Sequence, residues 1–171
     1  MPAGDGAGPA GVPAVTPAML AQEARNSLQL PTPTVGVNPD GANGNPALVN
    51  LPTWWWVTNG DSLTQRTAVG SVWAEVTAEP VSSTWVTGVG ERTECVGLGF
   101  AWVRGMDDYE RGSCSHTYRQ ADADEQAEVQ VVWRVSWVGS GGSGGTLDPF
   151  TMTATQDVPV YERQAIVTTV D

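Results

Sequence analysis

Apolar and polar residues alternate most regularly in residues 128–137. One set of alternate positions is wholly apolar and comprises Val129, Val131, Trp133, Val135 and Trp137. The intervening set is Gln130, Val132, Arg134 and Ser136. A two-residue period predicts a β-strand with one face in the core and the other mostly solvated.

Further strands are predicted along most of the remaining chain, in residues 47–58, 67–78, 81–85, 150–160 and 163–170. Pro52 places the first half of its stretch at a sheet edge, and residues 81–85, directly after Pro80, are predicted to form a neighbouring hairpin strand. Turn-forming residues fill three stretches, which are 34–46, 59–61 and the Gly/Ser-rich 139–145. The last of these is interpreted as a long hairpin connection.

A single helix is predicted near the N-terminus, in residues 16–28. Thr16 suits the N-cap and Pro17 the first helical position. A narrow apolar stripe follows, formed by Met19, Leu20, Ala24 and Leu28. A helix of about three turns is marginal alone, so we expect it to pack against the sheets. The alternative is a helix that binds a partner or connects domains.

These elements predict a mainly β chain, an antiparallel β-sandwich with one short N-terminal helix. Its 171 residues suffice for one domain with appendages. Residues 1–15 have almost nothing to bury and are predicted to be a flexible leader or linker. Residues 16–33 form the helix and a proline-rich connection, and residues 34–171 form the sandwich domain.

Composition and charge narrow the classes of function. Eight tryptophans accompany only two phenylalanines, so tryptophan and valine must dominate the core. A net charge of −11 repels nucleic acids and anionic membrane surfaces. No run approaches the ~20 apolar residues that cross a bilayer, so we expect no membrane insertion. No phosphate-binding loop surrounds Gly88 and Gly90, and the chain has no lysine for one.

Cys95 and Cys114 are the only cysteines and enclose an acidic loop. Neither a CxxC motif nor a set of four zinc ligands accompanies them. A Cys95–Cys114 disulfide is therefore predicted, and with it an oxidising compartment outside the cytoplasm. The charged and apolar regions of a signal peptide are missing, so an exported form would have lost its signal.

Three consecutive tryptophans, Trp54, Trp55 and Trp56, form a candidate binding site. In a strand, Trp54 and Trp56 share one face and Trp55 takes the other. At least one indole therefore lies outside the core or beneath a loop. An exposed indole could stack on a sugar ring or anchor a protein partner. The alternative is that the N-terminal helix or the glycine-rich loop covers Trp55.

Carboxylates gather between the two cysteines, where Asp107, Asp108 and Glu110 are a candidate calcium site. Their spacing is not that of an EF-hand, and the competing interpretation is a solvated acidic loop with no cofactor. His116 is the only histidine and lies two residues after Cys114, whose disulfide would restrain it, and this disfavours catalysis by His116. No catalytic residue is assigned. A hydrolase that uses two carboxylates is kept as a hypothesis, although the sequence selects no pair.

The stretch with Trp85, Gly88, Gly90, His116 and Tyr118 resembles the W-x-F-G-D-G and H-T-Y pattern of PKD domains, with Val89 in place of the aspartate. The chain also resembles a family of secreted actinobacterial proteins of unknown function, often labelled ATP/GTP-binding. The matching residues are 30–33, 48–56, 85–95, 114–118, 133–137 and 160–165. The resemblance implies an immunoglobulin-like and PKD-like sandwich in which the five motif residues are structural.

The sequence thus predicts a non-enzymatic sandwich of the cell exterior or envelope. It would serve protein–protein interaction, adhesion or assembly of a surface appendage, with a protein partner or a second copy. The family resembled is encoded near pilus-type secretion genes, which implies such a partner. The binding surface would be the tryptophan strand, the disulfide loop or a free sheet edge. The alternative is a carbohydrate-binding module that uses an exposed tryptophan.

Overall fold

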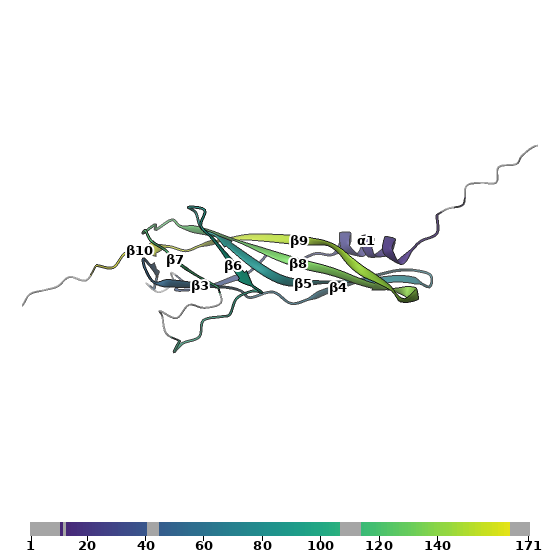
Figure 1. Cartoon of the computed structure of the whole chain (residues 1–171), viewed down its shortest axis with the longest axis horizontal. Coiled ribbons are helices and arrows are strands. Elements are labelled where there is room, and N and C mark those ends of the chain that lie inside the picture. Colours follow the sequence, from purple (N-terminus) through teal and green to yellow (C-terminus); the bar gives the residue numbers. More distant parts are fainter. Residues whose placement is uncertain (1–10, 12, 41–44, 107–113, 165–171) are drawn as a thin grey trace, which may run out of the picture.

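A computed structural model describes residues 11, 13–40, 45–106 and 114–164, and the described part is mainly β with one α-helix (Figure 1). The elements are α1 (Pro17–Ser27), β1 (Val35–Asn38), β2 (Ala47–Leu48), β3 (Pro52–Val57), β4 (Leu63–Val69), β5 (Val72–Val86), β6 (Arg92–Val96), β7 (Ser115–Thr117), β8 (Gln126–Gly139), the 3-10 helix η2 (Ser140–Gly142), β9 (Ser143–Asp157) and β10 (Val160–Tyr161). The predicted mainly β fold with an N-terminal helix is confirmed.

A large antiparallel sheet forms the body of the molecule, with strand order β4-β5-β8-β9. The long strand β5 has two successive neighbours on one edge. β4 pairs with its first half and β6 with its second half. Figure 1 shows the three long strands β5, β8 and β9 running side by side along an elongated molecule.

Two different layers cover this sheet. α1 packs on β4, β5 and β8 near one end, whereas β3 and β7 lie towards the other end (Figure 1). β3 is the middle strand of a small antiparallel sheet with the order β1-β3-β7. β2 and β10 form a separate pair, which is parallel and so departs from the all-antiparallel prediction. The fold is therefore a sandwich at one end and a helix-covered sheet at the other.

The helix begins as its sequence predicts. Thr16 Oγ1 accepts a hydrogen bond of 3.2 Å from the backbone N–H of Met19, and Pro17 occupies the first turn. Leu20, Ala21 and Ala24 are buried, which confirms the expected packing role. Met19 is exposed, so the predicted stripe was wrong at that position.

The alternation in residues 128–137 is confirmed by β8. Val129, Val131, Trp133 and Val135 are buried in the core, and Trp137 packs against it. Trp55, Trp85 and Trp133 are the largest fully buried side chains of the described residues. Tryptophan and valine therefore dominate the core, as the composition predicts.

Two predicted strands are divided by turns. Residues 67–78 cross the hairpin between β4 and β5, where Gly70 has a φ of +60° and begins a two-residue turn. Residues 47–58 form β2 and β3, separated by a turn in which Asn50 has a φ of +66°. In both places a single residue in the left-handed region reverses or bends the chain.

Three other boundaries also differ from the predictions. Residues 81–85 continue β5 instead of forming a new hairpin strand, and β1 lies within the supposed turn region 34–46. The long connection predicted at 139–145 is only the tight turn η2, because β8 and β9 pair up to Gly139 and Ser143. Arg163 and Gln164 are not in a strand, while 165–170 and most of the predicted leader lie outside the described residues.

Candidate functional site

The disulfide joins the two layers of the sandwich. Cys95 in β6 bonds to Cys114, just before β7, with a Cα–Cα distance of 5.3 Å. The backbone N–H of Trp55 in β3 donates to the carbonyl of Cys114 at 2.9 Å. The predicted bridge is thus confirmed, and it fastens the large sheet to the edge of the tryptophan strand.

A stack of aromatic rings fills the space beside this disulfide. The Trp55 and Trp85 rings have centroids 4.9 Å apart, and His116 lies against Trp55 at 5.5 Å with its plane inclined by only 8°. Tyr118 meets His116 edge-on at 4.7 Å. Trp85, from one part of the PKD-like motif, and His116 and Tyr118, from the other, therefore lie in one cluster around Trp55.

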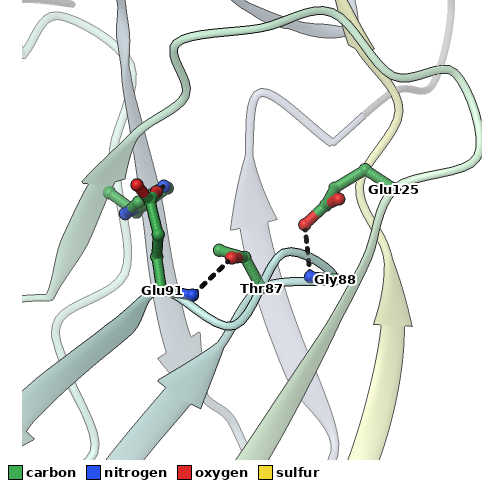
Figure 2. Close-up of polar contacts among 5 residues, drawn as sticks. Thr87, Gly88, Glu91 and Glu125 are labelled. Carbon is green, nitrogen blue, oxygen red and sulfur yellow. Dashed lines mark hydrogen bonds and ion pairs between the residues drawn. The ribbon is translucent and has the colours of Figure 1, made fainter.

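The two motif glycines lie in the turn that follows Trp85 and Val86. Gly88 donates its backbone N–H to Oε1 of Glu125 at 2.9 Å, and Glu91 donates its N–H to Oγ1 of Thr87 at 3.1 Å (Figure 2). A Cβ at Gly88 would lie 2.9 Å from Oε2 of Glu125, so only glycine fits without a shift. Gly90 has a φ of +86°, which also favours glycine.

Glu125 was missed by the sequence analysis as an individual residue. It lies near Asp122 and Asp124 in the sequence, yet its side chain is buried and holds the turn at Gly88. Its backbone carbonyl also accepts a bond of 2.8 Å from Val158 N–H. No local sequence signal distinguishes it from Asp122 or Asp124, because its partner is far away along the chain.

His116 and Tyr118 are held in their uncharged forms. Burial lowers the pKa of His116, and this outweighs the opposite effect of Glu91, whose Oε2 lies 3.0 Å from Nε2 of His116. Burial, and after it the charges of Glu125 and Glu91, raises the pKa of Tyr118. A cavity of about 290 Å³ adjoins Tyr118, Glu91 and Glu125. The cluster offers a neutral imidazole and two carboxylates, but the nearby cysteine sulfurs are bonded to each other.

The three consecutive tryptophans do not form an exposed binding strip. Trp54 and Trp55 are both buried, and Trp56 lies partly exposed across Gly36 of the neighbouring strand. Trp55 is covered by aromatic rings, not by α1 or the glycine-rich turn. Trp55 is therefore covered, as one of the two alternatives held, and the carbohydrate hypothesis cannot use its indole.

The candidate calcium site consists of three carboxylates in the segment between the two cysteines. Asp107, Asp108 and Glu110 lie outside the described residues. Within residues 11, 13–40, 45–106 and 114–164, no group of three His, Cys, Asp or Glu side chains is arranged to hold a metal ion. The same residues contain no helix of the length and apolarity needed to span a bilayer.

Residues 96–103, which we call the apolar loop, directly follow Cys95 of the disulfide. Val96 is 93%, Phe100 72% and Val103 58% exposed. The base of the loop is fixed to the sandwich, since Leu98 accepts at its carbonyl from Val57 N–H at 2.8 Å. Gly97 likewise accepts a bond of 3.1 Å from the Ser83 hydroxyl. The apolar loop, which belongs to the segment closed by the disulfide, therefore presents large apolar side chains to solvent, whereas the tryptophan strand does not.

No protein-family model, no curated protein and no solved structure matches this chain.

Proposed function

We propose that this chain is a non-enzymatic β-sandwich of the cell exterior or envelope that binds another protein through the apolar loop. The observation that carries the proposal is the exposure of Val96, Phe100 and Val103 on a segment whose base is fixed. Exposed apolar groups that gather on one short segment mark interaction sites more often than isolated exposed residues do.

Rigidity at the base of the loop favours binding. The disulfide at Cys95, the hydrogen bond to Leu98 and the close approach of Gly99 to Trp55 all hold the loop before any partner arrives. A preordered loop loses less conformational entropy on association, so more of the contact energy contributes to affinity. An aromatic side chain such as Phe100 is also a typical anchor at the centre of a protein interface.

The local charge supports a protein partner. The whole chain carries a net charge of −11, yet residues 96–103 contain no charged side chain. The core of a protein–protein interface is depleted of charge in the same way. A disulfide is compatible with an oxidising exterior, and the PKD-like and secreted-family resemblance points in the same direction.

The proposal is tested by co-sedimentation of the purified chain with an actinobacterial cell-envelope fraction. We expect Phe100→Ser to weaken binding about tenfold, the effect of losing one interface anchor. Val69→Ser is the matched control, because Val69 is an exposed valine at the β4–β5 hairpin, away from the apolar loop. Protease treatment of the envelope should abolish binding.

Two results would contradict the proposal. Equal weakening by Val69→Ser and Phe100→Ser would show that the contact is not made by the apolar loop. Binding that survives proteolysis of the envelope but is removed by free glycans would identify a carbohydrate receptor in place of a protein.

A further inference from the structure

β9 forms one margin of the large sheet and has a free outer edge. Its inner edge pairs with β8 along the strand, and β8 and α1 are the elements that pack substantially against it. Within the described residues, no strand pairs with its outer edge (Figure 1). Natural sheets usually protect such an edge with proline, charge, bulges or a covering element.

The first half of β9 is protected in this way. The backbone carbonyl of Asp148 accepts a hydrogen bond of 2.9 Å from Nε of Arg25 on α1, and the carbonyl of Pro149 accepts one of 3.4 Å from Nη2. Pro149 has no N–H to offer, and the pairing with β8 shifts register opposite it. A second strand could not continue along this part of the edge.

Between residues 151 and 155, the second half of β9 contains no proline, no charged side chain and no shift in its pairing with β8. Val158 donates its N–H inward to the carbonyl of Glu125. Successive residues of an antiparallel strand direct their N–H and C=O groups to opposite edges of that strand. The N–H and C=O groups of Thr151, Thr153 and Thr155 consequently point to the free edge. Gln156 Nε2 donates to the carbonyl of Asp157 at 3.0 Å, so this carbonyl already has a hydrogen-bond partner. The open part of the edge, residues 151–155, is called the window below.

We propose that a second copy of this chain docks here, with the two β9 strands antiparallel and Thr153 on the two-fold axis. Thr151 then faces the partner's Thr155, and Thr153 faces the partner's Thr153. About six backbone hydrogen bonds form, because each of these residues supplies both its N–H and its C=O. Opposed threonines are favourable cross-strand pairs.

The side chains of the window fit a second copy on both faces. On the inner face, Met152 and Ala154 pack against the core and are only half-buried. The same register places Met152 beside the partner's Ala154, which extends the apolar layer across the axis. Residues 150–156 carry no charge, so like charges do not meet at the contact.

Charge elsewhere on the chain predicts a salt response. Two chains of −11 each repel one another, and salt screens that repulsion with a Debye length of about 8 Å at physiological ionic strength. Association through an uncharged strand edge should therefore strengthen when NaCl is added. An interface built on ion pairs would weaken instead.

Sedimentation equilibrium of the full chain, from about 1 to 100 µM, tests this proposal. We expect a monomer–dimer equilibrium that NaCl shifts towards the dimer. Thr153→Pro removes an outward N–H without removing a bond to β8, and Thr153→Asp places two charges on the axis. Both variants should be monomeric, whereas Thr153→Val, which keeps the N–H, should remain dimeric.

Thr64→Asp is the matched control, because Thr64 is an exposed threonine on the other edge strand, β4. This variant should dimerise like the wild type, and circular dichroism should show that every variant is folded. A wild-type chain that is monomeric at all concentrations, or a folded Thr153→Asp variant that still dimerises, would overturn the proposal. Neither result would bear on the apolar loop, which lies on a different element.

Discussion

Trp55 and Trp85 stack with ring centroids 4.9 Å apart and an angle of 20° between their planes. Trp55 comes from the small sheet and Trp85 from the large one, and both are fully buried. Stacked indoles of this kind bury a large apolar area in a defined geometry. The pair is an apolar contact between the two sheets at the end of the molecule that carries the disulfide.

Replacing Trp55 with alanine should lower the free energy of unfolding by about 3–5 kcal/mol, the range for large aromatic deletions in a core. Urea denaturation followed by circular dichroism measures this. Trp56→Ala is the control, since Trp56 is the next residue but lies on the other face and is partly exposed. A similar loss for both variants would show that the stack adds little.

Removing the disulfide should cost about 3 kcal/mol, because the bridge closes a loop with a sequence separation of 19. The double variant Cys95→Ser with Cys114→Ser should still fold, since the aromatic cluster and the long strands remain. Its urea midpoint should fall relative to the wild type. An unchanged midpoint would mean that the two layers hold the loop closed without the covalent bond.

The sequence predicts well those elements whose signals are local. Thr16 and Pro17 define the start of α1, and the alternation in β8 depends on residues within one strand. The disulfide follows from there being only two cysteines. These features need no knowledge of which segments meet in space.

Features that depend on distant partners were not predicted. Pro80 does not end β5, although the pairing with β8 shifts register between Pro80 and Ser82. On the other edge, β4 starts at Leu63 opposite Ala78 and β6 finishes at Val96 opposite Ser82, so neither strand pairs with Pro80. The missing N–H of the proline falls in this gap between neighbours. Glu125 is similar, because its role depends on Gly88, which lies far from it in the sequence.

Acidification should destabilise the protein through His116. Because burial lowers the pKa of His116 below 6.5, the unfolded chain binds a proton at a higher pH than the folded chain does. The contribution of uncharged His116 to stability is therefore fully present above pH 6.5, and it is lost as the pH falls from there through the pKa of the folded state. A single group contributes at most about 1.4 kcal/mol per pH unit.

His116→Phe provides the comparison, since a phenyl ring can stack on Trp55 but does not titrate. Thermal or urea unfolding between about pH 5 and 7.5 should show a steeper loss on acidification in the wild type than in this variant. If the contact with Glu91 controlled the pKa instead, the difference would have the opposite sign. The wild type would then gain stability relative to the variant as the pH fell.

Gly99 should tolerate alanine less well than Gly97, although both lie at the base of the apolar loop. Their φ angles are +76° and +67°, so alanine is strained at either position by about 1 kcal/mol. A Cβ at Gly99 would also lie 2.5 Å from the carbonyl oxygen of Trp55, whereas one at Gly97 would meet nothing within 4 Å.

Gly97→Ala therefore measures the backbone strain alone, and Gly99→Ala adds a clash with the strand below. We expect Gly99→Ala to cost a further 1–3 kcal/mol or so in the free energy of unfolding, the usual range for overpacking. Since the clash lifts the loop from β3, Gly99→Ala should also weaken binding to the envelope fraction, while Gly97→Ala should change it little. Equal effects of the two substitutions would show that the loop is not seated on Trp55.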